Sequence, residues 1–268
     1  MSTSTEERPL ALVTGASSGI GYELARQFAD NGFDLIVTAE DAELSSAAAR
    51  LRDDGAQVTA VQTNLATDTG VDELYGAVRA AGRPLAAAAL NAGVGAGGAF
   101  ATDTELADEL RIVDLNVRGT VHLAKHVVRD MVARDEGRIL FTSSIASTMP
   151  GAFQAVYNAS KSFVQSLALA LREELEDTGV TVTSLMPGPT DTEFFERANM
   201  LDTRVGSGPK DDPADVASMG FKALMSDDER VVASSTKTKL QGRASRALPD
   251  NVKAKMHRKM AEPGKGKG

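Results

Sequence analysis

Short apolar runs alternate with amphipathic stretches along most of the chain. The runs have the length of buried strands, about four to eight residues, and turn residues follow them. They cover Leu10–Thr14, Leu35–Ala39, Val58–Gln62, Leu85–Leu90, Arg138–Thr142, Val180–Met186 and Arg230–Ala233. The stretches between them have helical period and cover Tyr22–Asp30, Asp41–Asp54, Asp72–Ala81, Leu106–Arg134 and Ala159–Asp177. This alternation predicts an α/β fold built on a doubly wound parallel sheet with helices on both faces.

The pattern predicts a single domain over residues 9–235. No glycine- or proline-rich linker interrupts the first 187 residues. The segment Pro187–Pro213 breaks the rhythm, since it contains several glycines and four prolines around two phenylalanines. An irregular segment of this kind is typical of a loop over a binding site, here the expected substrate loop.

A basic tail follows the domain over residues 236–268. It contains ten Lys or Arg residues against two acidic ones. One or two helices are expected over Thr236–Ala261, with Asp250 as an N-cap and with Val252, Met256 and Met260 on one face. We expect this tail to be an addition to the domain rather than part of its catalytic machinery.

Composition excludes several classes of protein. The 42% apolar and 25% charged residues are typical of a globular chain. The absence of cysteine excludes a disulfide scaffold, thiolate metal sites and a cysteine nucleophile. The net charge of −8 argues against a nucleic-acid partner. No apolar run approaches the roughly 18 residues of a membrane span and no signal-like segment is visible, which favours a cytoplasmic protein without an integral membrane segment.

A glycine turn connects the first predicted strand to the first predicted helix. Gly15, Gly19 and Gly21 stand where a doubly wound fold binds a dinucleotide, because glycines let the backbone approach the pyrophosphate and the helix start offers free N–H groups. The glycines could also be purely steric. The same residues, Gly15-Ala-Ser17-Ser-Gly19, match the nucleophile elbow of serine hydrolases. An elbow at Ser17 leaves no room for the strands that precede it in such enzymes, so a hydrolase is the weaker alternative.

Tyr157 and Lys161 stand four residues apart, a spacing that places both on one face of a helix. A nearby cation favours tyrosinate over tyrosine and lowers a pKa that starts at about 10. Two other tyrosine–arginine pairs have the same spacing, so spacing alone is not decisive. Tyr157 differs from them because it follows the strand Arg138–Thr142, whose end carries Ser143 and Ser144 toward the crevice that the glycine turn also faces.

Together these motifs resemble the classical short-chain dehydrogenase/reductase family. The order and spacing of the family are matched over about Leu10 to Thr192 by Thr14–Gly21, Asn91-Ala-Gly93, Asn116, Ser144, Tyr157-x-x-x-Lys161 and Pro187-Gly188. The resemblance implies a Rossmann-type fold and an oxidoreductase that transfers a hydride between NAD(P) and a carbonyl or secondary alcohol. Homodimers or homotetramers are expected by the same analogy.

The resemblance also implies a role for each catalytic residue. Tyr157 is expected to be the general acid in carbonyl reduction and the base in alcohol oxidation. Lys161 is expected to hold the nicotinamide ribose and to lower the tyrosine pKa. Ser144, rather than Ser143, is expected to bond to the substrate oxygen, because it lies thirteen residues before Tyr157, the family spacing. Asn116 is expected to kink the preceding long helix and to hold a water that links Lys161 to solvent.

The binding residues follow from the same resemblance. The cofactor is expected to contact Gly15, Ser17, Ser18, Gly19, Ile20, Gly21, Glu40, Asn64, Leu65, Asn91, Ala92, Gly93, Tyr157, Lys161, Pro187, Gly188, Thr190 and Thr192. The small-molecule substrate is expected to be apolar, in a pocket lined by Val94, Ser144, Met149, Phe153, Phe194, Phe195 and Met200. Asn64 replaces the aspartate usual at its position, and Leu90 replaces an asparagine, so the adenine contacts depart from the family pattern.

Glu40 and Asp41 follow the second predicted strand, about twenty residues after the glycine turn. An acid there accepts hydrogen bonds from both ribose hydroxyls, whereas a 2′-phosphate meets like charge. The sequence therefore predicts NAD in preference to NADP. Arg50 and Arg52 on the following helix are the basic residues that could reach a 2′-phosphate.

Two further expectations concern metal and turnover. His122 and His126 stand four apart on a predicted helix, but no glutamate or other carboxylate stands at a ligand spacing in the sequence, so no metal is expected. A nucleotide-binding regulator that keeps the fold without turnover is the alternative from another functional class. Intact Ser144, Tyr157 and Lys161 weigh against it.

Overall fold

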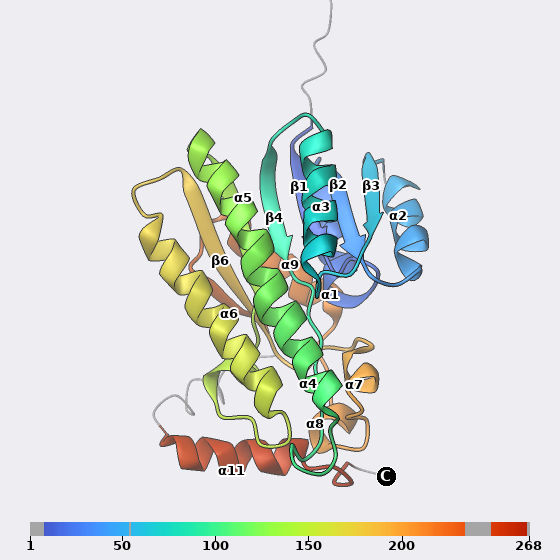
Figure 1. The fold of residues 1–268 in the computed structure, drawn as a ribbon, viewed down its shortest axis with the longest axis vertical. Coiled ribbons are helices and arrows are strands. Elements are labelled where there is room, and N and C mark those ends of the chain that lie inside the picture. Colours follow the sequence, from blue (N-terminus) through green and yellow to red (C-terminus); the bar gives the residue numbers. More distant parts are fainter. Residues whose placement is uncertain (1–7, 54, 234–247, 267–268) are drawn as a thin grey trace, which may run out of the picture.

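Seven parallel strands form the centre of the computed structural model, which describes residues 8–53, 55–233 and 248–266 (Figure 1). They lie in the order β3-β2-β1-β4-β5-β6-β7. Their bounds are β1 (Leu10–Thr14), β2 (Asp34–Ala39), β3 (Val58–Gln62), β4 (Leu85–Leu90), β5 (Gly137–Thr142), β6 (Val180–Pro187) and β7 (Arg230–Ala233). The predicted doubly wound, Rossmann-type sheet is confirmed, and every predicted strand is present with its ends displaced by at most one residue.

Helices cover both faces of the sheet. The helices α1, α2 and α9 pack on one face, and α3, α5 and α6 pack on the other, nearer the viewer in Figure 1. Within the described ranges no helix has the length and apolarity to cross a bilayer. The helices are α1 (Gly19–Asp30), α2 (Glu43–Asp53), α3 (Asp68–Ala80), α4 (Leu106–Ile112), the π-helix η1 (Val113–Gly119), α5 (Thr120–Arg134), the 3-10 helix η2 (Ile145–Thr148), α6 (Ala155–Glu174), α7 (Phe194–Arg197), α8 (Arg204–Ser207), α9 (Pro213–Met225) and α11 (Asp250–Ala261).

The central strand β1 shows why both layers form. Successive side chains of a strand point to opposite faces of the sheet. Ala11 and Val13 accordingly belong to the apolar cluster under α1, α2 and α9, while Leu10 and Leu12 belong to the cluster under α3, α5 and α6. All four side chains are buried. A strand with apolar side chains on both faces therefore requires cover on both sides.

An aromatic cluster joins α1 to α9. The Phe28 ring of α1 lies edge-on to the rings of Phe33 and Phe221, each at a centroid distance of 5.1 Å. Phe28 is fully buried. Because α9 comes late in the chain and α1 early, this cluster holds distant segments together on one face of the sheet.

The predicted helix Leu106–Arg134 is continuous, but its middle is a π-helix. Residues 113–119 form η1 between α4 and α5, with the buried Asn116 in its centre. At Gly119 a Cβ atom would meet the carbonyl oxygen of Leu65 at 2.1 Å, so the residue here must be glycine. Short π segments occur frequently at functional sites.

Several helix boundaries differ from the prediction. Helix α9 (Pro213–Met225) was not predicted, although the Asp212 side chain caps its Ala214 N–H at 2.7 Å and Pro213 begins it. Helix α6 starts at Ala155 rather than at Ala159, which places Tyr157 in its first turn.

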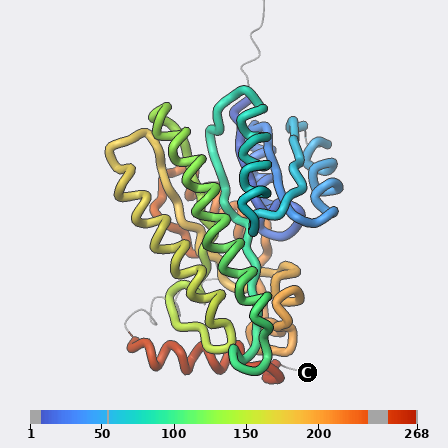
Figure 2. Tube along the Cα trace, viewed as in Figure 1, coloured from blue at the N-terminus to red at the C-terminus, as the bar shows by residue number. Residues whose placement is uncertain are grey.

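The tail differs in two respects. Of the residues predicted as helical, 236–247 lie outside the described residues, and α11 covers 250–261. Pro249 rather than Asp250 occupies the N-cap position of α11. Val252, Met256 and Met260 share one face as predicted, but that face is exposed, while His257 and Ala261 are buried. The tube in Figure 2 shows α11 crossing the end of the molecule below α6.

The aromatic cluster predicts a large stability difference between two phenylalanines. Phe28→Ala should lower the free energy of unfolding by about 3–5 kcal/mol, because it empties a closely packed position. Phe100→Ala is the matched control, since Phe100 is 62% exposed. This change should alter the free energy of unfolding by less than about 1 kcal/mol. Urea denaturation followed by circular dichroism measures both, and equal effects would contradict the packing described here.

Candidate active site

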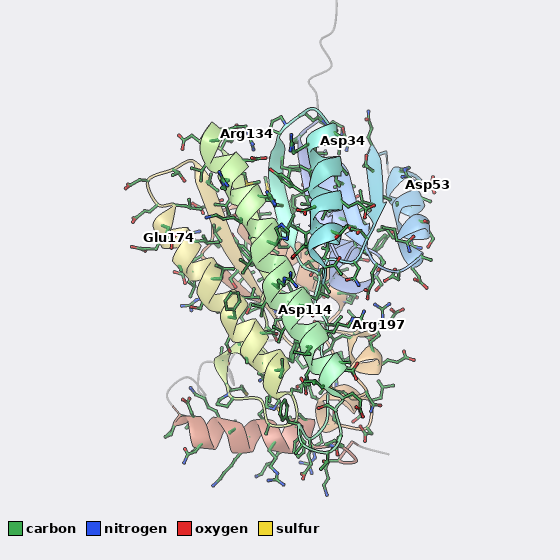
Figure 3. All side chains as sticks on the ribbon, viewed as in Figure 1. Asp34, Asp53, Asp114, Arg134, Glu174 and Arg197 are labelled. Carbon is green, nitrogen blue, oxygen red and sulfur yellow. The ribbon has the colours of Figure 1, made fainter. Side chains whose placement is uncertain are left out.

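A cavity of about 650 Å³ opens at the carboxyl ends of the strands. The glycine turn after β1, the ends of β4, β5 and β6, the segment after β6 and helix α11 all contribute to its wall. Apart from Asn116, Phe153 and Met200, every cofactor and substrate residue expected from the sequence lines it. Figure 3 labels Arg197 at this end of the sheet and Asp34 and Arg134 at the opposite end.

Asn116 lies directly behind the cavity wall. Its Oδ1 accepts a hydrogen bond from Val94 N at 2.9 Å, and its Nδ2 donates to Val94 O at 2.9 Å and to Ser160 Oγ at 3.0 Å. The side chain is fully buried. Asn116, in the centre of η1, therefore fixes the backbone after β4 to helix α6.

Phe153 and Met200 support the wall rather than line it. The Phe153 backbone has φ 65°, and the guanidinium of Arg258 from α11 lies 5.7 Å from its ring centroid. Met200 is fully buried in a small cluster with Phe195, Ala198 and Ala261. Both residues thus hold α11 and the segment after β6 in place.

The glycine turn meets the conditions for binding an anion. At Gly21 a Cβ atom would stand 1.9 Å from Gly15 O, so the turn requires glycine there. Gly15 and Gly19 have φ +66° and +54°. Among the described residues, the N-cap Ser18 makes no side-chain hydrogen bond to the start of α1. The first N–H groups of this helix are therefore available to a negatively charged group.

Ser17 does not have the partner that a hydrolase needs. Its hydroxyl donates to Asp41 Oδ2 at 2.9 Å. His257, which also lines the cavity, has its Nδ1 2.9 Å from Ala152 O. A nucleophile elbow requires a histidine beside the serine, so the arrangement disfavours the hydrolase alternative.

Tyr157, Lys161 and Ser144 converge at the middle of the cavity. Lys161 Nζ donates to Thr142 O at 2.9 Å and lies 6.0 Å from the centroid of the Tyr157 ring. Ser144 caps η2 by accepting from Ala146 N at 3.1 Å, and it also hydrogen-bonds to Tyr157. Ser143 instead donates to Lys161 O at 3.0 Å, which ties β5 to α6.

Burial dominates the ionisation of this cluster. It raises the pKa of Tyr157 to about 12, against a smaller lowering by the Ser144 hydrogen bond. It lowers the pKa of Lys161 to about 8. The expected net lowering of the Tyr157 pKa by Lys161 is therefore not found, because desolvation of the phenolate outweighs other influences. At neutral pH the pair is a phenol beside an ammonium.

Two acidic residues that follow β2, Glu40 and Asp41, also line the cavity. Glu40 forms an ion pair with Arg111 of α4. Arg197 of α7 approaches Asp41 with Nη1 3.8 Å from Oδ2. Asp41 Oδ1 is buried without a hydrogen-bond partner within residues 8–53, 55–233 and 248–266. The accessible carboxylate of the two is that of Glu40, whose side chain is 40% exposed and can accept hydrogen bonds from a ligand.

Sequence reasoning missed the two arginines. Arg50 and Arg52, the candidates from the sequence, point elsewhere: Arg50 Nε lies 3.2 Å from the Tyr22 hydroxyl, and Arg52 donates to Val58 O at 2.7 Å. No local pattern indicates Arg111 or Arg197, because each reaches its acid only through the packing of distant helices.

The substrate end of the cavity is mainly apolar. Phe194 lies 5.1 Å from the Tyr157 ring, centroid to centroid. Further lining comes from Val94, Met149, Phe195, Ala198, Val205, Met260 and Ala261. His257 joins them, and burial lowers its pKa. Helix α11 therefore forms one wall of the cavity, and its contribution was missed because it follows the last strand and carries no motif.

His122 and His126 lie outside this cavity, on the outer surface of α5. No carboxylate stands at a ligand spacing along the sequence, but the fold brings one beside these histidines. Asp72 of α3 lies with Oδ1 3.2 Å from His122 Nε2. The neighbour comes from another helix, which spacing along one helix cannot reveal.

Comparison with known proteins identifies relatives over most of the chain. A family model described as short chain dehydrogenase matches residues 9–201, so α11 lies beyond the matched part. The NADP-dependent 3-hydroxy acid dehydrogenase YdfG of Salmonella typhi is 33% identical over 67% of this chain and 71% of its own. Serine 3-dehydrogenase of Agrobacterium fabrum is 30% identical over 81% of this chain and 83% of its own.

Solved structures show the same fold. A short chain dehydrogenase/reductase from Burkholderia phymatum in complex with NAD superposes with a TM-score of 0.81, at 26% identity, covering 88% of this chain and 92% of that one. A short-chain dehydrogenase from Sphingobium yanoikuyae in complex with NADPH gives a TM-score of 0.78, at 28% identity, covering 90% and 96%.

The lowered pKa of Lys161 predicts a pH-dependent contribution to stability. Between pH 8 and about 10.5 the unfolded lysine binds a proton that the folded one does not, so the stability of the wild type relative to Lys161→Met should rise with pH. The full rise corresponds to about 3 kcal/mol. Urea denaturation of both proteins across this range measures it, and parallel stability curves would contradict the shift.

Proposed function

Because the chain belongs to the short-chain dehydrogenase family, we propose that it transfers a hydride between NAD(P) and the carbonyl or secondary alcohol of an apolar small molecule. The chain is an oxidoreductase of this family. One observation carries the finer proposal: Tyr157, Ser144 and Lys161 meet in a cavity that also contains the glycine turn.

The lining suits a dinucleotide. The start of α1 offers N–H groups to the pyrophosphate, and the carboxylate of Glu40, whose side chain is 40% exposed, offers acceptors to the adenosine ribose. Lys161 would hold the other ribose. When bound, NAD(P) supplies or accepts the hydride. The remaining proposed contacts are Asn64 and Leu65 at the adenine, Asn91, Ala92 and Gly93 along the adenosine, and Pro187, Gly188, Thr190 and Thr192 at the carboxamide.

The chain's own residues manage the proton. With a pKa of about 12, Tyr157 is a neutral phenol at pH 7 and can donate its proton to a substrate oxygen during reduction. Ser144 stands beside it and can hydrogen-bond to the same oxygen. Once Tyr157 has given up its proton, the Lys161 ammonium stabilises the phenolate, because an opposite charge favours the ionised form. In alcohol oxidation these transfers run in reverse.

The substrate proposal rests on the apolar end of the cavity. Phe194 lies against the Tyr157 ring, Met149 and Val94 line the same cavity, and Met260 of α11 extends the apolar wall. Apolar side chains desolvate an apolar substrate and leave its oxygen to the few polar groups at the centre. A carbonyl compound with an apolar body fits this distribution.

We also propose a homo-oligomer and a cytoplasmic location. Val121, Val132 and Phe163 leave apolar side chains exposed on α5 and α6, which supports a homo-oligomer through these helices. The cysteine-free composition supports a cytoplasmic location.

A panel of ketones, aldehydes and alcohols with NADH, NADPH and their oxidised forms tests the proposed function. Cofactor-dependent turnover of an apolar carbonyl is expected. Cofactor binding without turnover across the panel would favour the nucleotide-binding regulator instead. Ester hydrolysis without cofactor would favour the serine hydrolase at Ser17.

The catalytic roles predict an ordered set of variant activities. Tyr157→Phe removes the transferable proton while keeping the ring, so turnover should fall about 10²- to 10⁴-fold with cofactor affinity nearly unchanged. Lys161→Met should lower both turnover and cofactor affinity. Ser144→Ala should cost roughly 2.7–4 kcal/mol of transition-state stabilisation.

Ser143→Ala is the matched control for Ser144→Ala, and should be the milder of the two. Steady-state kinetics and NADH fluorescence titration on the four variants measure these effects, with circular dichroism to check folding. Near-normal turnover of Tyr157→Phe, or a larger loss from Ser143→Ala than from Ser144→Ala, would overturn the roles.

The acidic end of the cavity predicts a preference for NAD. Glu40 and Asp41 should disfavour a 2′-phosphate by about 1 kcal/mol, because Arg111 and Arg197 neutralise part of their charge. Glu40→Gln removes one charge and releases Arg111, so it should narrow or reverse the preference. Glu43→Gln, an exposed acid in the first turn of α2, is the charge-matched control. Titrations with NADH and NADPH measure the ratio of the two dissociation constants, and tighter binding of NADPH by the wild type would refute the preference for NAD.

A further inference from the structure

Two histidines and a carboxylate meet on the surface where α3 lies beside α5 (Figures 1 and 2). Asp72 Oδ1 lies 3.2 Å from His122 Nε2 and 3.9 Å from His126 Nε2. The three ligand atoms lie within 4.8 Å of one another. We propose that these residues form a zinc site, separate from the cavity, that links α3 to α5.

The spacing fits the coordination geometry of zinc. Bonds of roughly 2.0–2.2 Å to nitrogen and oxygen place the ligand atoms of a tetrahedral site about 3.3 Å apart. The Asp72–His122 distance of 3.2 Å agrees with this, and the 3.9 Å to His126 requires only a small rotation of the ring. Histidines four apart on one helix face are a recurrent zinc-binding arrangement.

A second carboxylate stands where a metal-bound histidine needs one. Asp68 Oδ1 lies 3.6 Å from His122 Nδ1, the ring nitrogen opposite to the one that faces Asp72. Metal-binding histidines usually donate their other ring N–H to a carboxylate, which fixes the tautomer and leaves the free nitrogen as the ligand. Asp68 also forms an ion pair with Arg118, which holds its carboxylate in place.

The ring of His126 is held by packing. Tyr75 of α3 stacks on it with a centroid distance of 4.4 Å and an interplanar angle of 20°. The Tyr75 hydroxyl in turn donates a hydrogen bond to the carboxylate of Asp130. Both imidazoles are therefore oriented before any ion binds, which reduces the entropy lost on binding.

Exposure and ligand type favour zinc over harder cations. The Asp72 side chain is 63% exposed, so an ion can reach the site from solvent and keep a water as its fourth ligand. Two imidazoles suit zinc and related transition metals, whereas magnesium and calcium prefer oxygen ligands.

Direct binding to the full chain, without an affinity tag and treated with chelator, tests the site. Calorimetry with Zn²⁺ should show one saturable site per chain, and Zn²⁺ but not Mg²⁺ should raise Tm, because the ion binds the folded arrangement of two helices. Co²⁺ should give the visible absorption of a nitrogen-bound tetrahedral ion. Absence of saturable Zn²⁺ binding would overturn the proposal and leave only an ion-paired histidine cluster.

Variants assign the ligands. His122→Gln and Asp72→Asn should each weaken Zn²⁺ binding by about 100-fold or more, and Asp68→Asn by about 10–100-fold through the orientation of His122. Glu73→Gln makes the same charge change one residue along α3, where Glu73 accepts from Thr63 Oγ1, and should leave binding unchanged.

The remaining histidine controls for binding elsewhere. The chain has three histidines, so His257→Gln should keep wild-type Zn²⁺ affinity. Binding that survives His122→Gln and His126→Gln but is lost in His257→Gln would refute the assignment. Because the surface variants remove no buried side chain, circular dichroism should show each of them folded.

Discussion

The strand order reverses between β1 and β4, and the cavity follows from that reversal. The connection after β1 crosses one face of the sheet toward β2, while the connection after β4 crosses the other face toward β5. Right-handed crossovers running in opposite directions leave a crevice at the carboxyl ends of the two central strands. Thr14 joins these ends, since its Oγ1 accepts from Asn91 N and Ala92 N at 2.9 Å each.

Burial then determines the chemistry inside the crevice. Lys161 is buried and Tyr157 is partly buried, which makes the lysine easier to deprotonate and the tyrosine harder. Burying this pair lowers the free energy of unfolding. Hydrogen bonds offset part of that loss: Lys161 Nζ donates to Thr142 O, and Asn116 bonds to both the N–H and the C=O of Val94. The site is thus a buried polar network whose members hold one another in place.

The two ends of the cavity are built by different parts of the chain. The glycine turn and Glu40 come from the first two strands, whereas Phe194 and Met260 come from segments after β6. Those later segments are held by few apolar contacts, in a small cluster around Phe195, Ala198 and Met200. The glycine turn and the apolar lining are thus supplied by separately packed parts of the chain.

The sequence by itself determined the strands, the glycine turn and the Tyr157–Lys161 pair, because each depends on neighbours a few residues away. Runs such as Leu10–Thr14 must be buried on both faces, and a spacing of four places two side chains on one helix face. Tertiary structure alone decided that Arg111 meets Glu40, that Asp72 meets His122 and that α11 forms one wall of the cavity. These contacts join residues far apart in the chain, and the packing of whole helices against the sheet sets their distances, which no local pattern records.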